Sequence, residues 1–178
     1  MNEKIQQADL DHLKVICYPD PRLLEVCTPV ETVDESVRRL IDRMFELMFT
    51  QRGVGLAAPQ VGLTVRLFVA SPTFDPDDRQ VFINPQITHT AGVQEGEEGC
   101  LSFPGISCKV KRRKIATICA LDPDGNEFEQ TGEDLTARIF QHETDHLDGR
   151  LLVHRMGSVA RLANRRALKD LEAEYARL

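Results

Sequence analysis

The sequence predicts a protein that combines helices with antiparallel β-strands, and two observations carry that prediction. Apolar residues recur with helical spacing in three regions, within residues 37–48, 135–146 and 159–178. Between the first two regions, short apolar runs alternate with short polar turns, a pattern typical of antiparallel pairing. The chain has 178 residues, which is enough for a single domain, residues 1–178, with its own core.

The composition excludes several classes of protein. Hydrophobic residues make up 42% and charged residues 28%, as in ordinary globular proteins. A net charge of −6 argues against a nucleic-acid binder that relies on bulk charge. Residues 1–10 hold no apolar run, so we expect no signal peptide, and no window has the length of a membrane span. Five irregularly spaced cysteines favour free thiols in a reducing cytoplasm.

The N-terminal third is predicted to contain one long helix. Residues 17–30 hold three prolines and should form extended chain on the surface. The helix within residues 37–48 should begin after Asp34, a good N-cap, and end at Gly53, and we interpret it as core packing. Residues 53–60 are either a simple turn or a stretch whose small side chains let a ligand approach the backbone closely.

Short strands are predicted in the middle of the chain. They cover residues 65–70, 81–83, 86–90, 114–121 and 127–131. Residues 71–80 read as a polar loop, and residues 122–126 have the composition of a hairpin turn. The basic run at 109–114 is interpreted as a solvated strand edge, with nucleic-acid contact as the alternative.

The two remaining helices follow these strands. The helix within residues 135–146 should be capped by Asp134 or Thr131 and should stop at Gly149. The C-terminal stretch, residues 159–178, carries an apolar stripe and should pack across the outside of the sheet.

Residues 141–146 read Gln-His-Glu-Thr-Asp-His and indicate a metal site. His142 and His146 lie four residues apart, so on a helix their imidazoles share one face and can chelate a single ion. Glu143 lies roughly 100° around the helix from His142, where its carboxylate suits a general base acting on water. The alternative is that one histidine packs while the other is exposed. Both histidines lie on the core-facing stripe, however, and buried imidazoles need a polar partner, which a bound cation would supply.

Cys100 is the candidate third ligand. It lies in Glu-Gly-Glu-Glu-Gly-Cys-Leu-Ser, residues 95–102, which is an unusual setting for a packed thiol. The residues alone leave open whether Cys100 is a ligand or a free surface cysteine. By contrast, Cys119 lies in an apolar run and looks like a packed strand residue.

Three stretches, residues 53–60, 98–102 and 141–146, occur in one order that resembles peptide deformylase. This family removes the N-terminal formyl group from nascent bacterial proteins. The likeness covers nearly the whole chain after about residue 15. Two positions depart from the family pattern, because His154 stands where an acidic residue is usual and Asp134 where glycine is frequent. Neither position belongs to a motif.

The resemblance implies an α+β fold in which antiparallel β-sheets surround a central metal-bearing α-helix, with an N-terminal helix and a C-terminal helix. It implies Cys100, His142 and His146 as metal ligands, with water in the fourth position. One Fe²⁺ per chain is the family's metal, and Zn²⁺, Ni²⁺ or Co²⁺ can substitute. By ligand chemistry alone, two histidines and a cysteine suit zinc, and three ligands with an open position are typical of a catalytic site.

The resemblance also implies a reaction. A metal-bound hydroxide attacks the formyl carbon of N-formylmethionine, and formate is released. Glu143 serves as the general acid and base. The developing oxyanion is stabilised by the metal, by the Leu101 backbone N–H and by the Gln60 side-chain amide.

Further residues are assigned to binding and support. The peptide backbone would align along Val54, Gly55 and Gly99. The methionine side chain would enter an apolar pocket for which Val54, Leu135, Ile139 and His142 are candidates. Glu98 and Arg112 are expected to pair and to hold the Cys100 loop.

We therefore expect a cytoplasmic hydrolase that acts on N-formylmethionyl nascent peptides during protein biosynthesis. Its expected partners also include the ribosome, contacted transiently, but no membrane and no specific nucleic acid. Basic residues of the last helix could make the ribosome contact: Arg161, Arg165, Arg166 and Lys169. Two alternatives stay open. One is a zinc endopeptidase, for which only His154 is available as a downstream ligand, and the other is a ribosome-binding module without the chemistry.

Overall fold

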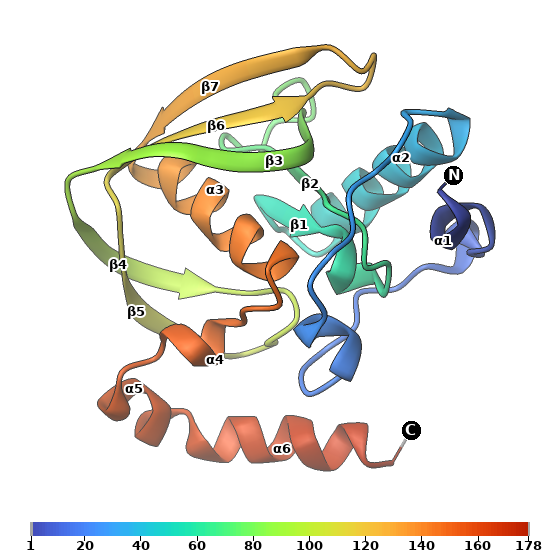
Figure 1. Ribbon diagram of the computed structural model, residues 1–178. Coiled ribbons are helices and arrows are strands. Elements are labelled where there is room, and N and C mark those ends of the chain that lie inside the picture. The colour runs from blue at the N-terminus through green and yellow to red at the C-terminus, as the bar shows by residue number, and fades with distance from the viewer. Residues whose placement is uncertain (1, 178) are drawn as a thin grey trace.

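Helix α3 (Asp134–Leu147) lies at the centre of the molecule, between two antiparallel sheets (Figure 1). The larger sheet has the strand order β1-β2-β3-β6-β7, and the smaller one pairs β4 with β5. The computed structural model describes residues 2–177. The arrangement confirms the expected α+β class, with antiparallel sheets on both sides of a central helix.

The elements have the following bounds. The strands are β1 (Gly55–Ala57), β2 (Leu67–Ala70), β3 (Gln80–Ala91), β4 (Gln94–Gly99), β5 (Ser107–Arg112), β6 (Ile115–Leu121) and β7 (Glu127–Glu133). The other helices are α1 (Glu3–Gln6), α2 (Glu35–Thr50), α4 (Leu152–Arg155), α5 (Ser158–Ala163) and α6 (Arg165–Tyr175), with 3₁₀ turns at Leu10–His12, Pro21–Leu24 and Ala58–Val61.

Strand β3 is continuous where two strands were predicted. Asn84 interrupts its ladder with a positive φ of 52°, and the register with β6 shifts between Ile83 and Gln86. The Asn84 side chain accepts a hydrogen bond from the Val30 backbone N–H and donates one to the Val30 carbonyl, both at 2.8 Å. This exchange occupies polar groups that the irregular ladder would leave unpaired. The predicted turn at 122–126 is confirmed between β6 and β7.

Helix α2 begins as predicted but ends earlier. Asp34 caps it by accepting a hydrogen bond from the Val37 backbone N–H at 3.1 Å. The helix ends at Thr50, and Arg52 adopts the left-handed conformation with a φ of 57°, so the predicted stop at Gly53 is wrong. Gly53 is instead close to Leu101, whose Cδ1 would lie 2.8 Å from an added Cβ. Its small size therefore makes room for Leu101.

Helix α3 follows strand β7 directly, without a capping side chain. The predicted caps, Asp134 and Thr131, are both wrong, because the N-cap residue is Glu133 and its side chain makes no capping bond. The Asp134 backbone N–H donates to the Lys114 carbonyl at 2.9 Å, so pairing between strands fixes the start. Gly149 ends the turn after the helix as predicted, with a φ of 68°.

The C-terminal segment forms two helices, α5 and α6, separated at Asn164. Leu168 and Leu171 of α6 are buried in an apolar cluster with residues from β5, α4 and the loop after β4. Helix α6 therefore covers the layer of the β4–β5 hairpin and lies far from the five-stranded sheet (Figure 1). The expected apolar stripe is incomplete, because Val159 and Leu162 are exposed, and Leu178 lies outside the described residues.

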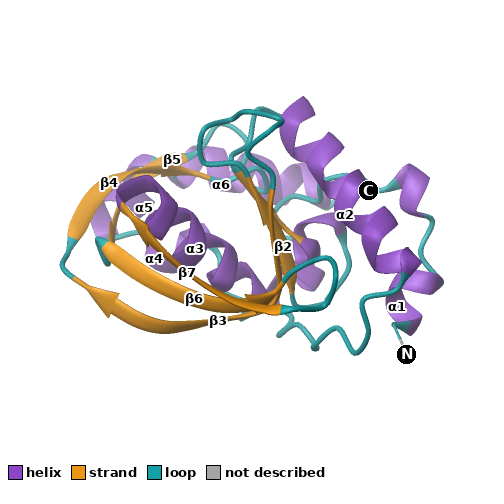
Figure 2. Cartoon of the chain, turned by 90° about the horizontal axis from the view of Figure 1, so that it is seen from above, coloured by secondary structure: helices purple, strands orange, loops and turns teal. Residues whose placement is uncertain are grey.

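Aromatic packing attaches α3 to the large sheet. The rings of Phe68 and Phe82 stack with centroids 4.6 Å apart, and Phe140 of α3 meets Phe82 edge-on at 5.1 Å. Viewed from above, α3 lies beneath β3, β6 and β7 (Figure 2). This face of α3 is fixed in the core, so the face that carries the two histidines is turned toward the β4–β5 hairpin.

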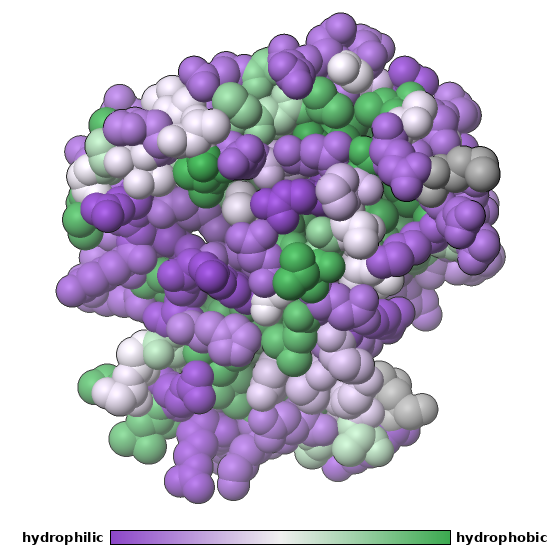
Figure 3. Space-filling model, in the orientation of Figure 1, coloured by the Kyte–Doolittle hydropathy of each residue, from purple (hydrophilic) through white to green (hydrophobic). Residues whose placement is uncertain are grey.

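The surface carries mainly hydrophilic side chains on the face shown in Figure 3. The outline narrows between the layer of α5 and α6 and the rest of the molecule. Within residues 2–177, no helix combines the length and the apolar character that crossing a lipid bilayer requires.

Candidate metal centre

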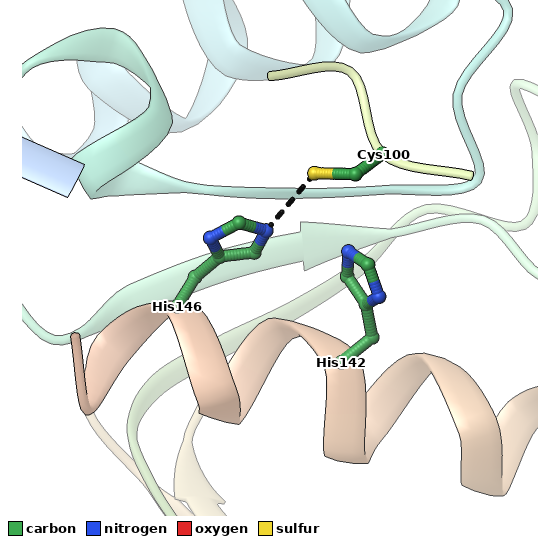
Figure 4. Close-up of side chains that lie close together, drawn as sticks. All are labelled: Cys100, His142 and His146. Carbon is green, nitrogen blue, oxygen red and sulfur yellow. Dashed lines mark hydrogen bonds between the residues drawn. The ribbon is translucent and has the colours of Figure 1, made fainter. Parts of the chain in front are cut away.

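Helix α3 places His142 and His146 one turn apart on one face. Their ring centroids lie 5.0 Å apart, and both rings project toward Cys100 (Figure 4). The Cys100 Sγ lies 3.2 Å from the His146 Nε2. One donor atom from each of these three residues lies within 4.8 Å of the others. The structure thus brings together the three side chains that the sequence analysis named as ligands.

The three donors fit a metal ion. Donors bound tetrahedrally at 2.0–2.3 Å lie about 3.5 Å apart, which is comparable with the spacing here. Burial opposes protonation of His142, but the Cys100 thiol and the Glu98 carboxylate outweigh it and raise its pKa well above the ordinary range. Burial and the neighbouring charge of His142 lower the pKa of His146. Cys100 and the Glu98 carboxylate beside the two imidazoles therefore form a site that favours a positive charge.

Cys100 follows strand β4 and is held from several directions. The Gln60 Nε2 lies 3.5 Å from its sulfur and donates to the Ser102 hydroxyl at 3.2 Å. The Gln60 Oε1 accepts from the Ala57 backbone N–H at 2.9 Å, which fixes the orientation of the amide. The Tyr18 N–H donates to the Ser102 carbonyl at 2.9 Å and ties the loop to the N-terminal segment.

Glu98 orients His142. Its carboxylate accepts a hydrogen bond from the His142 Nδ1 at 3.0 Å, which leaves the Nε2 free for a ligand. Arg112 donates to both Glu98 oxygens at 2.9 and 3.0 Å, and Arg138 donates to one at 2.7 Å. Burial raises the pKa of Glu98, but His142 and Arg112 reverse this and bring it well below the usual range.

Glu143 lies beside the donors and is 4% exposed. Its Oε2 has no hydrogen-bond partner within residues 2–177, and an added Cβ at Gly55 would collide with its carboxylate. Burial raises the pKa of Glu143 to about 7, a value at which a carboxyl exchanges protons readily near neutrality.

A cavity of about 720 Å³ opens onto this group. Its walls include all of the predicted catalytic and substrate residues: Val54, Gly55, Gln60, Gly99, Leu101, Leu135, Ile139 and Glu143. Leu135 is 48% exposed, so it lies near the surface. His146 and Arg112 do not line the cavity, because His146 is covered and Arg112 lies behind Glu98.

Sequence reasoning missed two residues that shape the site. Arg138 donates to Glu98 and to the backbone carbonyls of Val110 and Gly96. Its position four residues before His142, on the same side of α3, was a signal that could have identified it. Ser102, which is fully buried and accepts from Gln60, gave no comparable signal.

Two imidazoles, a cysteine sulfur and an adjacent buried carboxylate at an open cavity are the parts of a metal-dependent hydrolase site. Comparison with known proteins is more specific. The polypeptide deformylase family model matches residues 12–162. The chain therefore belongs to the polypeptide deformylase family, whose members are metal-dependent hydrolases.

Individual relatives support the same assignment. The chain is 47% identical to a peptide deformylase of Acidobacterium capsulatum, covering 83% of this chain and 88% of the relative. It is 42% identical to the peptide deformylase of Pseudomonas aeruginosa, covering 92% of this chain and 98% of the relative. Among solved structures, a plant peptide deformylase superimposes with a TM-score of 0.89 at 41% identity, covering 92% of this chain and 91% of the other. The peptide deformylase of Legionella pneumophila superimposes with a TM-score of 0.86 at 44% identity, covering 93% of this chain and 98% of the other.

Proposed function

We propose that residues 1–178 form one catalytic domain that hydrolyses the formyl amide of N-formylmethionine at the start of new polypeptides and releases formate. The observation that carries this proposal is the convergence of Cys100, His142 and His146 beside Glu143 at an open cavity. We place the enzyme in the cytoplasm, where nascent chains emerge. Its five cysteines are all free, in keeping with that compartment.

Cys100, His142 and His146 would hold the metal ion. We assign Fe²⁺ as its natural metal, with Zn²⁺, Ni²⁺ or Co²⁺ as substitutes, from its family membership; the thiolate and imidazole donors would also suit zinc. When bound, the ion would supply Lewis acidity that activates water and polarises the formyl carbonyl. Glu98 would keep His142 in the ligating tautomer, and Arg112 would keep Glu98 ionised and in place.

Glu143 would move the proton. Its unpartnered Oε2 accepts a proton from the attacking water and returns it to the amine that leaves. The pKa of about 7 allows the carboxyl to serve in both directions. Gly55 is essential to this role, since its missing side chain leaves space for the carboxylate.

The oxyanion would be stabilised by Leu101 and Gln60. The Leu101 backbone N–H has no acceptor within residues 2–177, and the Gln60 amide faces the sulfur of Cys100. Both groups line the cavity. Donors that are already oriented lower the barrier because they need no reorganisation during the reaction.

The substrate would lie between β1 and the end of β4. Its backbone would pass along Val54, Gly55 and Gly99, and the methionine side chain would contact Leu135 and Ile139. The nearest atom to an added Cβ at Gly99 is the Ile106 carbonyl oxygen at 3.8 Å. The glycine therefore keeps free space for a ligand and is not required by internal packing.

A direct test measures metal and activity on one preparation. The protein is purified without oxygen, its metal content is measured, and formate release from a formyl-Met peptide is assayed. Peptides that carry no formyl group and can be cleaved only at internal peptide bonds are assayed in parallel. Cleavage of these peptides, with no formate released from the formyl-Met peptide, would support the zinc endopeptidase. A metal-free and inactive protein would favour the ribosome-binding module.

We also propose a transient ribosome contact through α5 and α6. Arg161, Arg165, Arg166 and Lys169 are exposed on these helices, and their charges suit RNA phosphates. Ribosome binding that does not weaken with salt would contradict this proposal.

A further inference from the structure

We propose that a second cavity, on a different face of helix α3, binds the phosphate group of a small phosphorylated molecule. The cavity has a volume of about 580 Å³ and lies among β3, β5, α3 and the segment that follows α3. On α3 it is lined by Gln141, Thr144 and Asp145, and His142 is not part of it. The first cavity shares none of these three residues.

The walls of this cavity are strongly cationic. They carry five arginines and one lysine against two aspartates, Asp145 and Asp148, although the whole chain has a net charge of −6. Arg66, Arg112 and Arg155 are paired with carboxylates, so the uncompensated positive charge lies on the remaining three cations, Lys111, Arg113 and Arg150. Gathering like charges raises the energy of the empty site, and an anion relieves that repulsion.

Three of these cations are free to bind a ligand. The side chains of Lys111, Arg113 and Arg150 are exposed and make no ion pair or hydrogen bond to another residue among residues 2–177. Their backbones are nevertheless fixed. The Arg113 N–H and carbonyl both bond the Gln141 amide at 2.9 Å, and the Arg150 N–H donates to the Asp145 carbonyl at 2.7 Å. Anchored backbones hold the three side chains around one opening.

The interior of the cavity offers further donors. Arg112, 6% exposed, is occupied by Glu98 and Asp145, whereas Arg155 donates to the Asp145 carboxylate alone among the carboxylates. A guanidinium has five N–H groups, and Arg155 uses two of them here. The Thr144 Oγ1 is buried, lacks a partner within the described chain and belongs to a residue of the cavity wall.

The shape favours a small molecule over a nucleic acid. A volume of about 580 Å³ is within the range of small-ligand sites. Ile87 and Val93 add an apolar wall, and Val93 is 65% exposed without a covering group. The net charge of −6 disfavours an extended RNA track. These features fit a phosphate monoester that carries a small apolar group.

The test is an amide NMR titration of the full-length, zinc-loaded protein with phenyl phosphate and with inorganic phosphate. Ionic strength is held constant with chloride. We expect shifts at Lys111, Arg113, Thr144 and Arg150, with tighter binding of phenyl phosphate. Arg113→Ala and Arg150→Ala should each weaken binding about tenfold, because each removes a charge-assisted hydrogen bond. Lys109→Ala is the matched control, since this exposed lysine lies on the same strand outside the cavity.

Four results with the phosphate probes and the variants would overturn the proposal. They are an absence of shifts with either phosphate probe, shifts confined to the residues around Cys100, an equal loss of affinity in Lys109→Ala, and tighter binding of inorganic phosphate than of phenyl phosphate. A six-nucleotide single-stranded RNA is titrated in parallel. If it bound the same amides more tightly than phenyl phosphate, the surface would be assigned to nucleic acid and the small-molecule site rejected.

Discussion

Replacing Gly55 by alanine tests whether the position of the Glu143 carboxylate controls turnover. An added Cβ would lie 2.9 Å from the Glu143 carboxyl carbon and 3.1 Å from its Cγ. Ordinary carbon contacts are about 3.5–4.0 Å, so the carboxylate must move by roughly 0.5–1 Å. The end of a side chain can make such a shift at little cost in folding. Proton transfer tolerates it poorly, and a misplacement of about 1 Å lowers turnover roughly 100-fold.

The assay separates this effect from blocked substrate binding. We expect kcat for a formyl-Met peptide to fall about 100-fold, with metal content unchanged and a Tm shift of a few degrees at most. An obstructed cleft would instead raise KM and leave kcat intact. Gly157→Ala is the control, because nothing lies within 4 Å of an added Cβ there. A kcat of Gly55→Ala within threefold of the parent value would refute the reasoning.

Glu143→Gln should retain its metal, measured by elemental analysis, and lose turnover by several orders of magnitude; near-normal deformylation would contradict its role. Arg112→Ala leaves Glu98 and Asp145 short of a buried partner and should lower the free energy of unfolding by about 3–5 kcal/mol, measured with denaturant, together with metal retention. Unchanged metal content and activity in that variant would remove the supporting role. Removing the metal with a chelator should abolish formate release and lower Tm, and adding Ni²⁺ or Fe²⁺ should restore both. Asp20→Asn should destabilise the protein by about 1 kcal/mol at pH 7.

The Asp20 prediction has a definite pH dependence. Hydrogen bonds from Arg22 lower the pKa of Asp20 in the folded protein. The carboxylate therefore stabilises the fold above its unfolded pKa of about 4, and this contribution is lost as the pH falls through the folded value. In the Asp20→Asn variant the side-chain amide oxygen can still accept from the Arg22 backbone N–H, so the local turn is kept while the ion pair and the Arg22 Nη2 hydrogen bond to Oδ2 are lost. A difference between variant and parent that persisted unchanged at pH 2 would exclude this cause.

The sequence predicted well those structural features that depend on residues only a few positions apart. The spacing of His142 and His146 determines their shared face on any helix, and the structure places both rings toward Cys100. Asp34 caps α2 through a residue three positions away. The turn at 122–126 likewise depends on its own side chains.

Structural features that depend on contacts between residues far apart in the sequence could not be predicted from the local pattern of residues. The residues alone left Cys100 as either ligand or surface thiol, because its position depends on how the β4–β5 hairpin packs against α3. The start of α3 was misplaced since Lys114, in a neighbouring segment, sets it in place of a cap. For the C-terminal helix the sequence did not indicate which of the two sheets it covers, because an apolar stripe shows that a face is buried but does not identify its partner.

The donors of the candidate centre come from chain segments 46 residues apart, Cys100 and His146. No fragment that ends before α3 contains all three donors, and neither does one that begins after Cys100. The affinity for the metal ion therefore reports on tertiary structure, because the three donors come together only when the β4–β5 hairpin packs against α3. A chain that emerges from the ribosome would acquire its cation, and with it the ability to process other chains, only after residue 146 has left the exit tunnel.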